Sequence, residues 1–475
     1  TAYEITYGVW SSDVCSSDLI GGWIRISAFT FLGVCRSLWN WITLQSQNLM
    51  GVGTNLKYYI EQGGYYNDIT PLRTRDYSAT LTNPFDTTNT FATVTVNDTA
   101  HGAQAGDLVY FTGATTVGGI PAAELNTRHV ITSITNANAY VITVTTAATS
   151  TVTGGGGTVT AQYYLDAFLL GSNPFAVTNG LTTVVVTHTS HGATNNSFVT
   201  FSGATGPIGG IPAAEFNKEH QITYLTTNTY SITVTTSATS TTTGGGSAVY
   251  AEYQVNAGPE IQVPLTGWGS SGYGLGSWGS GVSSTDSLRL WSANNFGEDL
   301  VYGPRGGGVY YWDATNGVSA RGVNIVTLPG ALDPPVVQNF IFVSDTYRFV
   351  ICFGSNDVGS TTQDPMLIRW SDQESVTDWS PTSANQAGSI RLSHGSKIIT
   401  AVQTRQEIVV WTDTSLYSLQ YLGAPLVFGV QLLGDNLSIM GPNAVVIASG
   451  VVYWMGKDKF YSYSGRVQTQ NCDLR

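Results

Sequence analysis

Short apolar strands separated by glycine-rich turns recur along the chain, and no long stretch has the spacing of an amphipathic helix. One unit appears five times: an apolar strand, a short turn, and a second strand rich in tyrosine or tryptophan. The units occupy 50–60, 300–312, 350–370, 408–419 and 452–463. Their last four second strands start at Val309, Leu367, Leu416 and Phe460, which are 58, 49 and 44 residues apart. Propeller blades of four strands repeat at roughly 40–50 residues, so the unit predicts a propeller-like body with each hairpin in the middle of a blade. An antiparallel sandwich with repeated hairpins is the alternative.

The first and second hairpins are separated by about 240 residues, too many for a loop. A tandem duplicate fills this interval. An Asn-Pro-Phe triplet at 83–85, a His-Gly turn at 101–102 and the run 118–126 return at 173–175, 191–192 and 209–217. The offset stays at 90 or 91 residues throughout. We therefore expect two copies of one small domain, inserted after the first blade.

Each copy is expected to be a small β-barrel. In the first copy, the runs 93–96, 108–111, 129–132 and 140–144 predict strands, and alternation of threonine with valine or isoleucine predicts one wet face. Proline starts a helical turn over 121–126, with Glu124 near its positive end.

The predicted organisation has six parts, and the fold class is all-β. They are a sequencing-adapter scar (1–19), a first blade region (20–80), barrel copy 1 (81–168), barrel copy 2 (169–256), a Gly/Ser/Trp-rich loop (257–284) and the remaining blades (285–475). The scar is inferred from 10–19, which resembles a translated adapter and is excluded from fold reasoning. We expect the native C-terminal portion to be missing.

The loop at 257–284 contains the candidate interaction residues Trp268, Tyr273 and Trp278. Disordered linkers are poor in aromatic residues, so we expect these rings to fix the loop to a surface or to a neighbouring subunit. The run 274–279 matches a dinucleotide-binding pattern but lacks the preceding strand, the following helix and the acidic partner. We expect no cofactor and no metal.

Composition supports an all-β protein, because 54 glycines supply turns and only 11% of the residues are charged. The net charge is −12, from 19 basic and 31 acidic residues, which argues against neutralising DNA phosphates. It fits a wall past which DNA slides, and solubility explains it equally well. Outside the scar, Cys35, Cys352 and Cys472 have neither metal spacing nor a disulfide framework, so folding in a reducing compartment is expected. Neither a signal peptide nor an apolar stretch of about twenty residues appears, which predicts a soluble protein.

Two groups of residues are candidates for chemistry. His101 and His129, repeated as His191 and His220, could hold a metal if the fold joins them, although a turn in which the ring bonds to backbone is the favoured interpretation. Carboxylates in the run 370–379, namely Asp372, Glu374 and Asp378, could serve glycoside hydrolysis. A solvated connection within a blade is the favoured interpretation, so we expect no enzyme.

Several runs resemble structural proteins of tailed-phage virions: 33–41 (GVCRSLWNW), 51–59 (GVGTNLKYY), 63–71, 359–372 (GSTTQDPMLIRWSD) and 453–461 (YWMGKDKFY). The resemblance points most closely to the tail nozzle, or tail hub, of short-tailed phages. It implies a hexameric propeller-bearing ring that is assembled in the host cytoplasm and lies below the adaptor in the virion. This ring continues the DNA channel, retains the genome and opens at infection. The alternative is a receptor- or carbohydrate-binding tail protein in which Trp268, Tyr273 and Trp278 stack on sugars.

Overall fold

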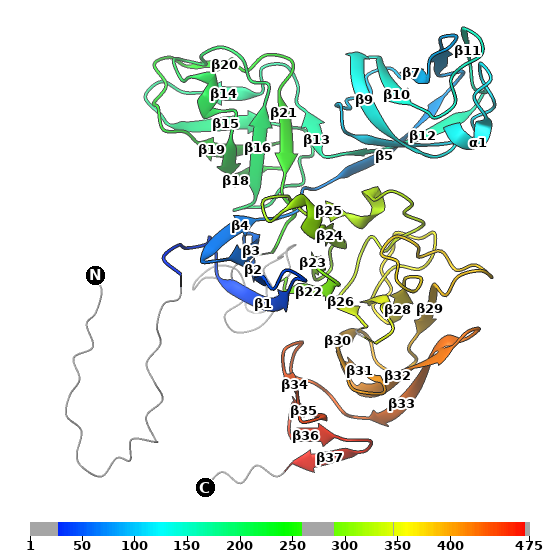
Figure 1. Ribbon diagram of the computed structural model, residues 1–475. Helices are drawn as coiled ribbons and strands as arrows, with labels where there is room; N and C mark the ends of the chain where they lie inside the picture. Colours follow the sequence, from blue (N-terminus) through cyan, green and yellow to red (C-terminus); the bar gives the residue numbers. More distant parts are fainter. Residues whose placement is uncertain (1–26, 259–288, 345, 471–475) are drawn as a thin grey trace, which may run out of the picture.

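The computed structural model describes residues 27–258, 289–344 and 346–470 (Figure 1). These residues form 37 strands, a single four-residue α-helix and three short 3-10 turns, so the protein is all-β. Five four-stranded antiparallel sheets form the propeller-like body, and two tandem domains of curved sheets lie between the first and second of them in the sequence.

We call the five sheets blades 1 to 5. Blade 1 contains β1 (Cys35–Ile42), β2 (Asn48–Thr54), β3 (Tyr58–Gln62) and β4 (Tyr65–Asp68). Blade 2 contains β22 (Trp291–Phe296), β23 (Asp299–Pro304), β24 (Tyr310–Trp312) and β25 (Val323–Asn324). Blade 3 contains β26 (Phe340–Val343), β27 (Val350–Phe353), β28 (Leu367–Trp370) and β29 (Gly388–Arg391). Blade 4 contains β30 (Ile398–Gln403), β31 (Ile408–Thr412), β32 (Ser415–Gly423) and β33 (Val427–Asp435). Blade 5 contains β34 (Val445–Ala448), β35 (Val451–Met455), β36 (Phe460–Tyr463) and β37 (Val467–Gln470). The turns η3 (Ala314–Asn316) and η4 (Ile325–Thr327) flank β25.

The five repeated hairpins are the two middle strands of the five blades, as the sequence predicts. The middle strands of blades 2 to 4 are apolar because both of their faces meet neighbouring blades. Successive blades share hydrophobic clusters: blades 1 and 2, 2 and 3, 3 and 4, and 4 and 5. Between blades 4 and 5, for example, the rings of Trp411 and Trp454 pack edge to face with their centroids 5.5 Å apart. The blades thus follow one another along an arc (Figure 1).

The two ends of the arc are exposed. Strand β35 turns Val452 and Trp454 toward blade 4, whereas Tyr453 and Met455 point to the opposite face and are 41% and 40% exposed. Phe460, paired with Met455 across β35 and β36, is exposed on the same face. At the other end, exposed Leu38 and Ile42 of β1 lie opposite the face that buries Trp41. Among the described residues, no hydrophobic cluster joins blade 5 to blade 1.

Barrel 1 is the name we give to residues 75–165. Its strands are β5 (Arg75–Leu81), β6 (Phe85–Thr87), β7 (Thr93–Asn97), β8 (Leu108–Thr112), β9 (Arg128–Asn136), β10 (Ala139–Thr143), β11 (Val152–Gly154) and β12 (Val159–Leu165), with α1 (Ala122–Leu125) before β9. They form one sheet in the order β11-β6-β7-β10-β9-β8-β12-β5, rolled around its own hydrophobic core. Strands β5 and β11 are its edges, so the roll is not closed by hydrogen bonds.

Barrel 2, residues 167–253, repeats this arrangement. Its strands are β13 (Ala167–Leu169), β14 (Phe175–Val177), β15 (Thr183–Thr187), β16 (Phe198–Ser202), β17 (Glu219–Gln221), β18 (Thr223–Thr226), β19 (Thr229–Thr233), β20 (Thr242–Gly244) and β21 (Tyr250–Tyr253), with η2 (Ala213–Glu215) before β17. The strand order is the same, but the long strand β9 of barrel 1 is replaced by the two shorter strands β17 and β18. The sheet is therefore divided in two around one core.

The expected helical turn forms as α1, but Glu124 has a further role. Its carboxylate accepts hydrogen bonds from Thr145 and from the amide of Thr146, the latter at 3.0 Å, and α1 has no side-chain cap. Glu215 does the same in barrel 2 with Thr235 and Thr236. These hydrogen bonds lower the pKa of the Glu215 carboxyl to about 2. Each carboxylate thus fixes the turn after a strand.

Candidate functional site at the joint of propeller and barrels

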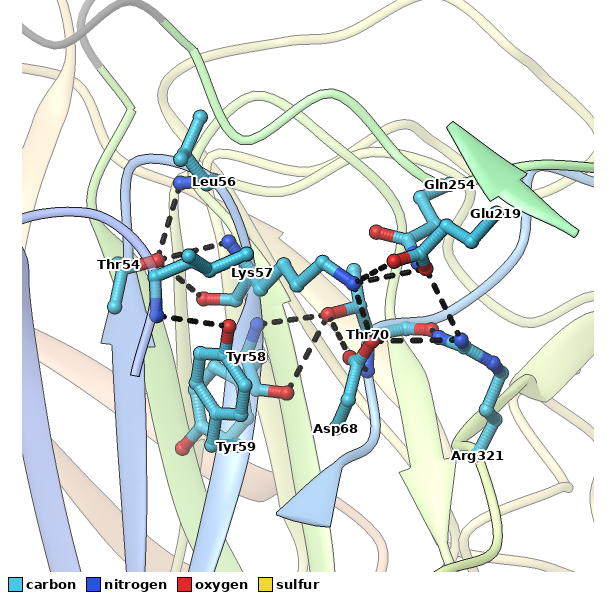
Figure 2. A network of polar contacts seen from close by, with 11 residues as sticks. Thr54, Leu56, Lys57, Tyr58, Tyr59, Asp68, Thr70, Glu219, Gln254 and Arg321 are labelled. Atoms are coloured by element: carbon cyan, nitrogen blue, oxygen red, sulfur yellow. Dashed lines mark hydrogen bonds and ion pairs between the residues drawn. The ribbon is translucent and has the colours of Figure 1, made fainter. Parts of the chain in front are cut away.

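A buried lysine joins blade 1 to barrel 2. The turn between β2 and β3 presents Lys57, because the hydroxyl of Thr54 accepts hydrogen bonds from the amides of Leu56 and Lys57, at 3.1 and 2.8 Å. The Lys57 side chain is only 5% exposed, and its Nζ lies 2.7 Å from Asp68 and 2.7 Å from Glu219 (Figure 2). Asp68 ends blade 1 and Glu219 begins β17, so this ammonium bridges two units far apart in the sequence.

A second cation reaches the same carboxylates from blade 2. Nη2 of Arg321 lies 3.4 Å from Asp68 and 3.7 Å from Glu219, and Nη1 donates to the carbonyl of Thr70 at 2.7 Å. Gln254 donates to Glu219 at 2.7 Å (Figure 2). Burial alone would raise the pKa of the Asp68 carboxyl, but Arg321 and Lys57 outweigh it and hold that pKa below its ordinary value. The charges of the two cations and the two carboxylates cancel. The cluster therefore links blade 1, blade 2 and barrel 2 through ion pairs.

The chain entering barrel 1 also pairs with the chain leaving barrel 2. Leu72 and Gln254 form an antiparallel bridge, the amide of Arg73 donates to Tyr253 at 2.7 Å, and the amide of Val255 donates to Pro71 at 3.0 Å. The two connections therefore lie side by side as a narrow neck.

Arg73 extends from this neck into barrel 2. Its guanidinium lies over the rings of Tyr253 and Phe168, with centroids 4.7 and 5.1 Å away, and donates to the carbonyl of His191 at 2.6 Å. In barrel 1 the hydroxyl of Tyr77 bonds to the equivalent carbonyl, that of His101. Arg73, which lies outside the duplicated region, thus makes the hydrogen bond in barrel 2 that Tyr77 makes in barrel 1.

Barrel 1 contacts the propeller through Arg128, which donates to the carbonyls of Val326 and Leu328, the latter at 3.3 Å. Arg128 and Glu219 precede the paired histidines His129 and His220, so they hold the same position in the two copies. The equivalent position therefore contacts the propeller in both barrels, through a cation in barrel 1 and an anion in barrel 2.

The candidate residues Trp268, Tyr273 and Trp278 lie outside the described residues, as does the glycine pattern at 274–279. Their proposed role in sugar or subunit contacts stays a prediction.

The predicted histidines lie in the barrels and bond to backbone, which confirms the favoured interpretation. His101 and His191 donate from Nε2 to a carbonyl at 3.1 and 2.8 Å, and each Nδ1 accepts an amide at 3.1 Å. Both nitrogens of these two rings are used, so a metal would have to break a bond. His129 and His220 are engaged through Nε2 by the carbonyl four residues earlier, and burial lowers the pKa of each. Within the described residues, no group of three His, Cys, Asp or Glu side chains is placed to hold a metal ion.

The acidic run lies in the connection between β28 and β29. Asp372 accepts the amide of Gln386 at 2.8 Å, and Asp378 accepts the side chain of Asn385 at 2.9 Å. Glu374 is exposed. The two aspartates thus order their own loop, as expected for a solvated connection.

The residues of the joint were not singled out from the sequence. Their positions, from 57 to 321, follow no local pattern. One signal was present: the charge changes from Arg128 to Glu219 within an otherwise similar stretch of the duplicate.

No protein-family model matches the chain, and neither does any curated protein sequence. Similar solved structures include the phage phi92 endosialidase, at 11% identity and a TM-score of 0.19, with 82% of this chain and 65% of that chain covered. Another is the extracellular domain of the putative one component system BT4673 from B. thetaiotaomicron, at 11% identity and a TM-score of 0.23, with 92% and 65% covered. The chain thus spans slightly less than two thirds of either structure. At TM-scores this low, neither supports an inference about fold or function. No helix of the described residues has the length and hydropathy to cross a membrane.

Proposed function

We propose that this chain is a structural protein of a tailed-phage virion, a nozzle or hub ring that continues the DNA channel. The sequence runs at 33–41, 51–59, 359–372 and 453–461 support this family. The main structural support is the uncovered apolar face at each end of the five-blade arc. A protein whose role is assembly needs such faces, because they are buried only when a neighbour is added.

The occupant of these faces in our proposal is a second copy of the chain. Blade 5 offers Tyr453, Met455 and Phe460, and blade 1 offers Leu38 and Ile42 at the opposite end. A contact between two different faces is heterologous, and it generates a ring when its rotation closes. The proposed ring is hexameric and binds the phage adaptor and other tail proteins.

The charge of the chain is consistent with a channel component. With a net charge of −12 on each chain, the ring would repel the phosphates of passing DNA, so DNA would not adhere to its wall. The proposed protein holds the packaged genome by geometry and has no enzymatic activity. Saccharide turnover that is lost on Asp372→Asn would contradict that last statement.

The test is the assembly state of the chain alone and with the adaptor, by light scattering and electron microscopy. We expect sixfold rings, and Phe460→Asp should give single chains. Val152→Asp is the matched control, because Val152 is similarly exposed but lies on barrel 1. A protein that stays monomeric with the adaptor, or rings unaffected by Phe460→Asp, would overturn the proposal.

A further inference from the structure

A groove of about 640 Å³ lies where the two barrels meet. Small-molecule sites usually have volumes of about 300–1,000 Å³. Arg75 at the start of β5 forms one side, and barrel 2 supplies the rest, including Phe168, Asn173, His188 and Thr189. This groove is separate from the Lys57 cluster and from the faces at the ends of the arc.

The duplicate provides an internal comparison for this groove. By strand register Phe168 replaces Ala79 of barrel 1, since these residues pair with the equivalent Ala251 and Ala161. At the offset of 90, His188 replaces Asp98, whereas Asn173 repeats Asn83. The framework is the same, yet barrel 2 has two rings where barrel 1 has a methyl group and a carboxylate. The groove has therefore lost a negative charge and gained apolar surface.

The hydrogen bonds around His188 leave a donor available. Tyr230 and Tyr253 bond through their hydroxyls at 2.9 Å, and the hydroxyl of Tyr253 lies 2.6 Å from Nδ1 of His188. Burial, reinforced by Arg73, lowers the pKa of His188 to about 4, so the ring is neutral at pH 7. When the Tyr230 hydroxyl donates to Tyr253 and Tyr253 donates to Nδ1, Nε2 bears the hydrogen. No described residue accepts it.

The charges around the groove are positive. Arg73 and Arg75 are both close enough to His188 to lower the pKa of its ring. Arg75 lies over the ring of Tyr77, 4.5 Å from its centroid, and forms no salt bridge with the described residues. In a chain of net charge −12, this guanidinium is placed to bind an anion.

We propose that this groove binds a carboxylated saccharide. The half-buried ring of Phe168 offers an apolar surface to one face of a sugar. Arg75 pairs with the carboxylate through its planar fork of donors. Nε2 of His188 and the amide of Asn173 bond to hydroxyl groups. This activity is additional to the assembly role and does not depend on it.

The experiment uses the full chain on an array of uronate- and sialate-containing oligosaccharides, with the methyl ester of each as a neutral twin. The parent protein should bind carboxylated sugars at least tenfold more tightly than their esters. Arg75→Gln should abolish that difference. Phe168→Ala, which introduces the residue of barrel 1, should weaken binding to both forms.

Because Phe168 also packs on Arg73, Thr189→Trp provides a second test from the exposed rim, and it should block the groove without disturbing that packing. Ser78→Ala, at an exposed position on β5 of barrel 1, is the control and should change nothing. The proposal is overturned if the parent binds no carboxylated glycan, or if binding survives both Arg75→Gln and Thr189→Trp.

Discussion

Arg128 and Glu219 occupy the same position in the two barrels, and both side chains bond to the propeller. Arg128 donates to carbonyls at the end of blade 2, whereas Glu219 accepts from Lys57 and lies 3.7 Å from Arg321. One position of an ancestral barrel has thus been adapted to two different docking surfaces. The position carries a cation where it meets backbone carbonyls and an anion where it meets Lys57 and Arg321.

Reversing the charge of Glu219 should open the joint. Glu219→Arg would place a third cation beside Lys57 and Arg321, whereas Glu219→Gln keeps a hydrogen-bonding group. Disrupting a largely buried ion pair costs about 3–5 kcal/mol, and the one-third exposure of Glu219 puts this case near the lower value. Hydrogen exchange of β4 and β21 should rise strongly in Glu219→Arg and less in Glu219→Gln. Arg391→Gln, which removes an exposed ion pair with Asp364, should leave exchange unchanged.

Replacing Arg73 should loosen barrel 2 more than the equivalent change loosens barrel 1. Arg73→Leu removes the hydrogen bond to the carbonyl of His191 and the contact with two rings, at a cost of about 2–3 kcal/mol. Tyr77→Phe removes only one hydrogen bond, worth about 1 kcal/mol. Proteolysis within 167–253 for Arg73→Leu, and within 75–165 for Tyr77→Phe, should report the difference. Equal protease resistance of both variants would argue against this role of Arg73.

Asp107 should make the stability of barrel 1 depend on pH. Burial raises the pKa of its carboxyl to about 6, against an ordinary value of 3.8. The folded barrel therefore binds this proton more tightly than the unfolded chain. The resulting stabilisation is complete below about pH 4 and is lost as the pH rises through 6.

Asp107→Asn removes the charge and keeps an acceptor for the amide of Gln104. We expect the free energy of unfolding of the variant to exceed that of the parent by about 1–2 kcal/mol at pH 8, after allowance for solvent screening. At pH 4 the two free energies should be equal. Thermal melting at the two pH values measures this. An advantage of the same size at both would refute the titration of Asp107.

Trp454→Ala should unfold blade 5 without unfolding the other blades. The ring is buried against Trp411 and stacks on Tyr461, and its loss should cost about 3–5 kcal/mol. Since each blade packs only on its neighbours, the damage should stay local. Hydrogen exchange of blades 2 and 3 should be unchanged, and that of blade 5 should reach the unprotected limit. Phe460→Ala, at an exposed position, should cost less than about 0.5 kcal/mol.

Patterns within a few dozen residues were sufficient to predict the blade hairpins and the barrel strands. The alternation at 452–463, for example, reflects the burial of Val452 and Trp454 on one face. The joint could not be predicted in this way, because Lys57, Glu219 and Arg321 become neighbours only when three units dock. The second role of Glu124 was missed for the same reason, since Thr145 and Thr146 reach it across the barrel.

The neck at Leu72 and Gln254 has an evolutionary consequence. Because the incoming and outgoing chains run adjacent there, the barrels form a cassette with a single attachment point. A lineage can gain, double or discard such a cassette by recombination while the blades keep their own hydrophobic contacts. We therefore expect related chains to have similar blades but none, one or three barrels inserted at this point.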